Sequence, residues 1–307
     1  MVMCYLFLAM SEETKTWSIS RLLDWTSNFF LKKGLHAPRL SAELLLAKVA
    51  GWDRIDLYTR FDHILSPEQL DRFRNFVKRA ASGYPVSYIL GEKEFYSINF
   101  AVNPHVLIPR PESELLVDAA VDYLRYLDVP GCVWDVCTGC GCVAAAIALN
   151  APVSRVLATD ISREAVEVAS TNIEALGLGN FVTVCCSDLL DVPPEWNGKR
   201  VFDCITANPP YVASDEPLGF SVDNEPAIAL QGGNDGLDLI RPLVAGAAGL
   251  LKSGGLFCIE FGLGQADAVQ ELFDKSDQFE IPDILNDIQD LPRTVVARRK
   301  IHRGCLP

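Results

Sequence analysis

The residues Asn208-Pro209-Pro210-Tyr211 end the apolar run VFDCITA and combine groups suited to binding a planar amide or amino group. Neither proline can donate a ladder hydrogen bond, so a strand must end there. The side-chain oxygen of Asn208 and the carbonyl oxygen of Pro209 could both accept from a substrate NH₂ group, and Tyr211 could pack against a flat group. Two such acceptors would hold a poorly nucleophilic nitrogen in line with an electrophilic methyl group. For the motif taken alone, a turn without chemistry is the alternative.

A second constellation lies in DVCTGCGCVAAAIAL, where Asp135 precedes a turn with Gly139 and Gly141 and then a helix. Glycine lets the backbone approach a ligand, and the helix N-terminus offers N–H groups to an anion. Asp160 ends the next strand roughly 20 residues later, where an acid can bind ribose hydroxyls. A dinucleotide site prefers a third glycine, which is Ala144 here. The stretch CTGCG is closer to the loop that holds the methionine part of S-adenosylmethionine.

The remaining cofactor candidates lie in CSDLL, where Asp188 and Leu189 could edge and pack an adenine ring. A plain turn after the strand is the alternative. Cys137 and Cys140 form a C-x-x-C pair, but no second C-x-x-C follows, so small residues filling a tight loop are favoured over a metal or disulfide site. The four histidines are scattered and suggest no nucleophilic triad.

Periodicity predicts the elements that must position these residues. Helices are expected within 17–34, 39–51 and 66–83, ending near Gly34, Gly51 and Gly83, with Ser66 as an N-cap. Residues 86–108 are rich in β-branched and aromatic residues and predict strands or a hairpin. Strands are then expected at 132–137, 155–159, 181–186, 201–207, 256–261 and 293–299, with helices near 142–150, 163–176 and 236–252. This alternation predicts a parallel, doubly wound α/β sheet. Residues 213–235 form a long connection, which is either functional or simply mobile.

Charge is divided unevenly along the chain. Residues 1–110 hold 14 basic and 11 acidic residues, whereas residues 111–307 hold 13 and 29. An acidic C-terminal part is a poor partner for nucleic acid or an anionic membrane. The ten cysteines do not resemble a secreted disulfide framework and indicate a reducing, cytoplasmic setting. The apolar start MVMCYLFLAM lacks a basic region and is too short to span a bilayer, so it is read as an extension, or Met10 as the start.

Several stretches together resemble the PrmC/HemK family, the N5-glutamine methyltransferases of peptide chain release factors. The resemblance runs from about residue 17 to 300 and is most specific in PVSYILGEKEFYSINFAVNPHVLIPRPESELLV. It also rests on RLSAELLLAKVAG, ATDISREAVEVASTN, TANPPYV and NEPAIALQGGNDGLDLI. NPPY alone is shared with enzymes that methylate amino groups of nucleic acids.

The resemblance implies a class I, Rossmann-like, S-adenosylmethionine-dependent domain with a small N-terminal helical domain that docks the release factor. The expected boundaries are 1–85 for the helical domain, 86–109 for a β-hairpin linker and 110–307 for the methyltransferase domain. The substrate would be the glutamine of the factor's Gly-Gly-Gln loop. Its implied contacts are Asn208, Pro209, Pro210, Tyr211, Arg110 and Glu112. The implied cofactor contacts are Cys137, Thr138, Gly139, Cys140, Gly141, Asp160, Asp188, Leu189 and Asn208.

Two departures from the family pattern bear on cofactor binding. The family usually has glycine where Cys137 stands and commonly a large aromatic residue near Leu189. Three alternatives remain open. They are a ribosomal-protein glutamine substrate, an adenine-N6 nucleic-acid methyltransferase, which needs a basic cleft, and a non-catalytic S-adenosylmethionine-binding protein, which has no need of paired acceptors.

Overall fold

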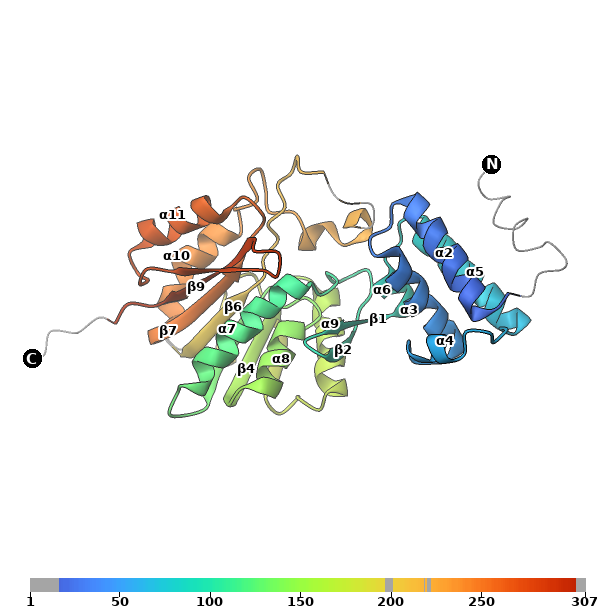
Figure 1. Cartoon of the computed structure of the whole chain (residues 1–307). Helices are drawn as coiled ribbons and strands as arrows, with labels where there is room; N and C mark the ends of the chain where they lie inside the picture. The colour runs from blue at the N-terminus through green and yellow to red at the C-terminus, as the bar shows by residue number, and fades with distance from the viewer. Residues whose placement is uncertain (1–16, 197–200, 218, 220–221, 302–307) are drawn as a thin grey trace, which may run out of the picture. The chain divides into compact units, whose positions relative to one another are not determined.

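The computed structural model describes residues 17–196, 201–217, 219 and 222–301. The apolar stretch 1–10, including the alternative start at Met10, lies outside the described residues. The chain divides into two compact units, with the main boundary between Leu90 and Gly91 (Figure 1). The segment Gly219–Asn224 groups with the first unit. Within the described residues, no helix combines the length and apolarity needed to cross a bilayer.

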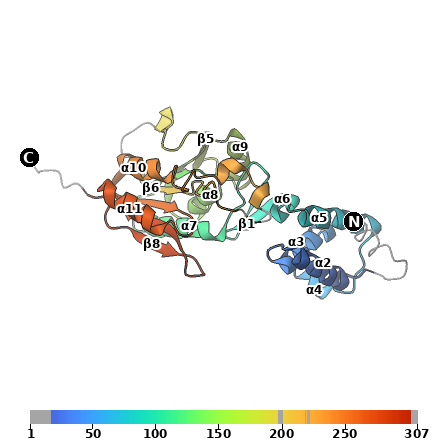
Figure 2. The ribbon, with the colours of Figure 1, turned by 90° about the horizontal axis from the view of Figure 1, so that it is seen from above.

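The first unit is a bundle of helices, seen in blue and cyan in Figures 1 and 2. Its helices are α2 (Ile19–Lys33), α3 (Pro38–Ala50), α4 (Asp56–Thr59), α5 (Pro67–Ala81) and α6 (Val86–Leu90), and the short turn η3 (Val222–Asn224) groups with them. Gly34 and Gly51 end α2 and α3 in the left-handed conformation, as predicted. Ser66 caps α5 in a capping box with Gln69. The apolar faces of these helices form one core that contains Leu22, Leu45 and Phe73.

The prediction of strands from residue 86 onward is wrong at its start. Residues Val86–Leu90 form helix α6, and the buried side chain of Ile89 joins the core of the first unit. Burial against neighbouring helices outweighs the strand preference of these β-branched and aromatic residues. The hairpin is shorter than predicted, since it consists of β1 (Glu92–Phe95) and β2 (Ile98–Ala101).

The hairpin is bonded to helices of the second unit. Its turn residues Tyr96 and Ser97 have φ of 52° and 61°, the left-handed geometry of a two-residue hairpin turn. The Tyr96 hydroxyl donates to Asp118 at 2.8 Å. The Asn172 side chain pairs with both backbone groups of Ala101, at 2.8 and 3.0 Å. These bonds fix residues 92–101 as part of the second unit.

The second unit is built on one seven-stranded sheet with the order β5-β4-β3-β6-β7-β9-β8. Its strands are β3 (Gly131–Val136), β4 (Val153–Asp160), β5 (Val182–Cys186), β6 (Phe202–Ala207), β7 (Leu251–Glu260), β8 (Asp283–Asn286) and β9 (Pro292–Arg298). Its helices are α7 (Glu114–Arg125), α8 (Cys142–Asn150), α9 (Arg163–Ala175), α10 (Ile240–Leu250) and α11 (Ala266–Ser276). Short helical turns are η1 (Pro111–Ser113), η2 (Pro194–Trp196) and η4 (Ala227–Ala229).

The sheet is mixed, which corrects the prediction of a parallel one. Strands β5, β4, β3, β6 and β7 are parallel, but β9 runs antiparallel to both of its neighbours, β7 and β8. Because β8 and β9 are joined by the short connection 287–291, they pair as a hairpin at the edge. The parallel strands β3 and β6 are in register from Val133 with Cys204 to Val136 with Ala207, so their carboxyl ends lie together.

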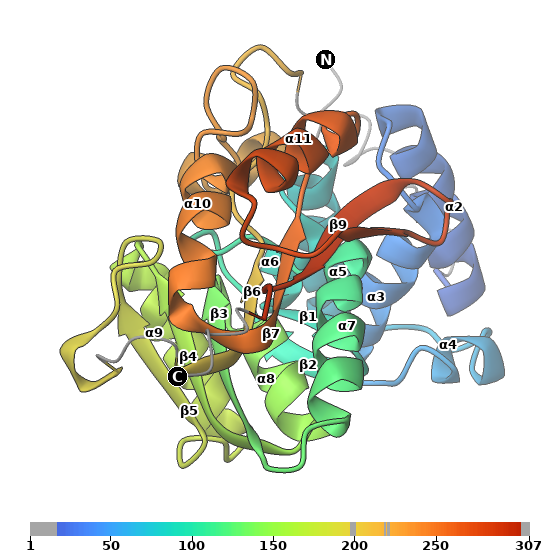
Figure 3. The same cartoon turned by 90° about the vertical axis from the view of Figure 1, so that its left-hand side faces the viewer.

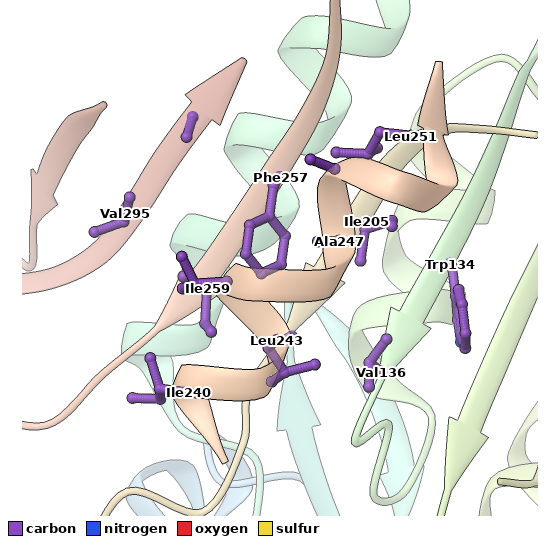
Figure 4. Close-up of a cluster of buried hydrophobic side chains, with 14 of the residues drawn as sticks. Trp134, Val136, Ile205, Ile240, Leu243, Ala247, Leu251, Phe257, Ile259 and Val295 are labelled. Carbon is purple, nitrogen blue, oxygen red and sulfur yellow. The ribbon is translucent and has the colours of Figure 1, made fainter. Parts of the chain in front are cut away.

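Helices cover both faces of this sheet, and Figure 3 shows α10 and α7 on opposite sides of β6 and β7. Under α10, the side chains of Leu243 and Ala247 pack with Trp134, Ile205 and Phe257 in one buried cluster (Figure 4). All five residues are fully buried, with 0% of their surface exposed. The close packing of this core keeps the central strands rigid. Helix α10 begins at Ile240, later than the predicted residue 236, and α7, α11 and β8 were not predicted.

Candidate active site

The loop after β3 has the backbone geometry that the sequence suggested. Gly139 and Gly141 have φ of 56° and 81°, and Gly141 caps the start of α8. A β-carbon on Gly139 would meet nothing within 4 Å, whereas one on Gly141 would lie 3.3 Å from the Ala169 side chain on α9. Gly139 therefore leaves open space beside the loop, and Gly141 lets α8 begin close to α9. Cys137 has φ of 58° without being glycine, so it carries backbone strain.

Asp135 holds this loop in place through hydrogen bonds, a role that the sequence analysis did not assign to it. Its carboxylate accepts from the Thr138 hydroxyl at 2.6 Å and from the Thr206 hydroxyl at 2.7 Å, which joins the loop to β6. Burial raises the pKa of Asp135 to about 6, although both hydroxyl groups oppose the shift. The strand register places Asp135 opposite Thr206, so the bond follows from the pairing of β3 with β6.

Asp160 lies at the end of β4, as predicted. Its carboxylate accepts from the backbone N–H of Gly139 at 2.9 Å and from that of Ser162 at 3.0 Å. Burial raises the pKa of this carboxyl, and the backbone donors act in the opposite direction. The carboxylate thus stands beside the open space at Gly139, within reach of a ligand bound there.

These groups border a cavity of about 340 Å³, within the size range of small-molecule sites. The predicted site residues that line it are Arg110, Cys137, Thr138, Gly139, Cys140, Asp160, Asp188, Leu189, Asn208 and Pro210. The other four are not among the lining residues of the described chain. They are Glu112, Gly141, Pro209 and Tyr211.

Other walls of the cavity were not predicted. Ile161, directly after Asp160, is half exposed and adds an apolar surface, and His105 and Ile228 also line the space. The signal for Ile161 was its place after the acid that ends β4. Ile228 comes from the long connection 213–235, so part of that connection belongs to the site.

The acceptor motif is held by a buried network. The Asn208 Nδ2 donates to Ser113 Oγ at 2.9 Å, and the Ser113 hydroxyl donates to Glu260 at 2.6 Å. The Tyr211 hydroxyl donates to the other oxygen of Glu260 at 3.0 Å. Burial raises the pKa of Glu260 to about 7, and it also raises the pKa of Tyr211. Sequence analysis missed Ser113 and Glu260 because nothing local marks them as partners of Asn208.

The backbone of Tyr211 is bonded by Gln265, at the start of α11, and lies close to Gly236. The Gln265 side chain donates to the Tyr211 carbonyl oxygen at 2.9 Å. A β-carbon on Gly236 would lie 2.1 Å from that same oxygen, so only glycine fits there. The ring of Tyr211 packs on the core beneath α10 and not along the cavity.

Arg110 is fixed at the rim by Glu225. The buried Glu225 carboxylate accepts from the Arg110 guanidinium and, at 3.0 Å, from the backbone N–H of Ile108. This ion pair joins the 108–110 segment to the middle of the long connection, and it leaves Arg110 on the cavity wall.

The cysteines of the loop are free thiols. Burial raises the pKa of the Cys137 thiol, with Asp160 and Asp135 adding to the shift, which disfavours a reactive thiolate. Among the described residues, no group of three or more His, Cys, Asp or Glu side chains is placed to hold a metal ion.

Comparison with known proteins adds independent findings. Residues 21–91 match the family model of the PrmC N-terminal domain, and residues 113–281 match that of the methyltransferase small domain. The chain is 42% identical over 260 residues to a protein of Rhodopirellula baltica, covering 82% of this chain and 86% of the relative. It is 39% identical over 270 residues to a protein of Geobacter sulfurreducens, covering 87% of this chain and 92% of that relative. Both relatives are named release factor glutamine methyltransferase.

A solved structure supports the fold. A methyltransferase from Pyrococcus furiosus aligns with a TM-score of 0.50 at 18% identity, covering 68% of this chain and 92% of that one. At this identity the likeness shows the fold alone. The fold is that of class I methyltransferases, as the sequence predicted.

Proposed function

The chain belongs to the family of release factor glutamine methyltransferases, and from this premise we propose that it methylates the side-chain amide nitrogen of a release factor glutamine. The acceptor is the glutamine of the factor's Gly-Gly-Gln loop, and the methyl donor is S-adenosylmethionine. The observation that carries the proposal is the setting of Asn208 at the cavity wall, where its Nδ2 is bound by Ser113. In the described chain, no protein donor reaches its Oδ1, which is left to accept from a substrate.

The size and the charge of the cavity suit S-adenosylmethionine. The donor supplies a methyl group on a positively charged sulfur atom. Three carboxylates line the cavity, those of Asp135, Asp160 and Asp188, and they favour a cationic ligand. The open space at Gly139 admits a ligand against the backbone. We assign the methionine part to residues 137–141, the ribose to Asp160 and the adenine to Asp188 and Leu189, with Ile161 as a further apolar wall.

The residues of the motif act by binding and orienting the acceptor nitrogen. Asn208 Oδ1 accepts one of its N–H groups at the cavity wall, and we assign the other to the carbonyl oxygen of Pro209, although Pro209 does not itself line the cavity. These bonds resist delocalisation of the nitrogen lone pair into the amide. The effect is positioning plus electrostatic stabilisation. The nitrogen gains the methyl group as the bond between that group and the sulfur breaks, and it then loses one N–H proton to water, so no strong base is required. Pro209 and Pro210 keep the turn stiff because proline fixes φ. Tyr211 contributes from behind the turn, through Glu260. Arg110 lies on the cavity wall near the acceptor, whereas Glu112 does not line the cavity.

The first unit serves substrate docking in this proposal. It carries the PrmC N-terminal family match and the mildly basic part of the chain, and the chemistry lies in the second unit. The 13 basic and 29 acidic residues of positions 111–307 disfavour a nucleic-acid substrate. The chain has ten cysteines, and the eight that lie in the described residues are free thiols. This supports a cytoplasmic setting.

A transfer assay with labelled S-adenosylmethionine tests the proposal. The substrates are a purified release factor, the same factor with Gln→Ala in its Gly-Gly-Gln loop, a ribosomal-protein preparation and duplex DNA. Label is expected on the intact factor alone. Equal labelling of the Gln→Ala factor would refute the assigned acceptor, and labelling of DNA or of ribosomal protein alone would favour the corresponding alternative.

A further inference from the structure

Four side chains form one continuous line of hydrogen bonds beside the carboxyl ends of β6 and β7. Asn208 donates to Ser113, and Ser113 and Tyr211 both donate to Glu260. Ser113 is 3% exposed and Glu260 is 1% exposed, so water does not replace these partners. Ser113 comes from η1 and lies 147 residues from Glu260 along the chain. The network therefore joins three separate segments behind the acceptor motif.

The number of protons that the hydroxyl groups of this network can donate determines which way the Asn208 side-chain amide is turned. A serine hydroxyl has one proton, and an ionised carboxylate can only accept. The Ser113 proton is therefore committed to Glu260, at 2.6 Å. Ser113 Oγ can then only accept from Asn208, so the amide must present Nδ2 to Ser113 and turn Oδ1 away from it. An amide turned the other way would set two acceptors against each other.

We propose that Glu260 is a positioning residue for methyl transfer, whose ionised carboxylate acts through Ser113 to hold the Asn208 amide with its oxygen available to the acceptor nitrogen. The inference rests on the proposed function and deepens it. Glu260 touches neither ligand, since it is buried and does not line the cavity. Its effect passes to the reaction only through Ser113 and Asn208.

The carboxylate is suited to this role because it accepts from two hydroxyl groups at once. A neutral amide at position 260 would offer one acceptor and one donor. If its donor faced Ser113, the serine proton would be released toward Asn208 and the amide there would turn over. If its donor faced Tyr211, the buried phenol would lose its acceptor, which is costly.

Protonation of Glu260 has a similar consequence. Burial raises its pKa to about 7, the charge of Glu112 adds to the shift, and Arg293 opposes it together with the hydroxyls of Ser113 and Tyr211. Glu112 lies on η1 and Arg293 on β9, the segments packed against the end of β7. On the Tyr211 side, the facing cationic groups are Arg293 and Arg110.

A protonated Glu260 can donate to Ser113, and the serine proton is then free to face Asn208. The Asn208 amide then turns over, so that its Oδ1 accepts from Ser113 and its Nδ2 faces the acceptor nitrogen. Activity is therefore full above the pKa of Glu260 and falls as the pH is lowered through about 7. A glutamine side chain and a sulfonium group do not titrate in this range, and the α-amino group of S-adenosylmethionine is the same for every variant, so an acid limb that is lost in Glu260→Gln is assigned to Glu260.

The first test is the pH profile of kcat and KM on an intact release factor, at saturating S-adenosylmethionine. The wild type should lose activity below about pH 7, with a slope near tenfold per pH unit. Glu260→Gln should lower kcat by about 10²-fold and show no acid limb. Ser113→Ala should lower kcat similarly, and Ser113→Thr should restore it by returning a hydroxyl. Ser154→Ala, which removes a hydroxyl bonded to Gly131 at the amino-terminal ends of β3 and β4, is the matched control and should be unchanged.

The second test follows the Asn208 side-chain NH₂ signal by ¹⁵N NMR in the absence of any substrate, assigned by its loss in Asn208→Asp. The signal should shift with pH near 7 in the wild type and stay constant in Glu260→Gln and Ser113→Ala. If this titration is seen but the wild type never methylates the factor, the proposed function fails and the positioning network stands. A constant Asn208 signal in the wild type, or an acid limb that survives in Glu260→Gln, would overturn the inference.

Discussion

The backbone strain at Cys137 predicts which of two variants at this position, Cys137→Gly or Cys137→Ala, is the more stable. Cys137 has φ of 58°, in the region that glycine adopts freely and other residues adopt at a cost of about 1–2 kcal/mol. Cys137→Gly relieves that strain. Cys137→Ala keeps it, and both variants lose the same sulfur atom. The difference in the free energy of unfolding between the glycine and the alanine variant therefore isolates the effect of the backbone conformation.

The magnitude follows from two opposing effects. Glycine loses about 0.5–1 kcal/mol relative to alanine because its unfolded chain is freer. Relief of about 1–2 kcal/mol of strain exceeds this, so Cys137→Gly should be more stable than Cys137→Ala by about 0.5–1 kcal/mol. At Glu167, inside helix α9, the order should be the usual one, with Ala more stable by about 1 kcal/mol.

Chemical unfolding of the four variants measures both differences. An alanine variant at position 137 that is more stable than its glycine counterpart would refute the strained loop. Calorimetric titration of S-adenosylmethionine extends the test, since Cys137 lines the cavity. Cys137→Gly should bind as tightly as the wild type or more tightly, and Cys137→Leu more weakly because it crowds the site. A reductant should change neither result, because burial raises the pKa of this thiol.

Three further predictions concern other parts of the site. Asn208→Ala should leave folding intact and lower turnover by about 10²–10³, and near-normal turnover would exclude it as an acceptor. Asp160→Asn should weaken S-adenosylmethionine binding by about tenfold in calorimetry, and unchanged affinity would remove it from the ribose site. Burial raises the pKa of Asp135 to about 6, above an unfolded value near 4, so its contribution to the free energy of unfolding decreases as the pH rises through about 4–6. In denaturant unfolding, Asp135→Asn should remove this decrease, and an unchanged pH dependence would contradict it.

The domain assignment gives one more test. A fragment of residues 91–307, which begins at the boundary between the two units, should bind S-adenosylmethionine and lose activity on the intact release factor. If it folds and binds the cofactor, full activity on the whole factor would refute the docking role of the first unit. Retained activity on a short glutamine peptide would agree with it.

Local patterns in the sequence predicted much of this fold. The caps at Gly34, Gly51 and Ser66 act within a few residues, so they are visible in the sequence. Strand β6, which ends at Ala207, was predicted for the same reason, because the two prolines after Asn208 stop it. Helix α6 was not, since burial of Ile89 in the helical core decides its conformation.

The missed parts of the site depend on distant partners. Ser113 and Glu260 meet only after the sheet has formed, and Asp135 meets Thr206 only through the pairing of β3 with β6. No local spacing encodes such contacts. The antiparallel edge of the sheet was missed for a similar reason, because strand direction is set by pairing and not by the composition of residues 283–298.

The most direct test of the central claim is mass spectrometric mapping of a release factor after incubation with the wild-type protein and S-adenosylmethionine. The proposed function predicts one added methyl group, on the side-chain amide nitrogen of the glutamine in the Gly-Gly-Gln loop, and about 10²–10³-fold slower methylation with the Asn208→Ala variant. An unmodified loop glutamine, or a methyl group on any other residue of the factor, would contradict it.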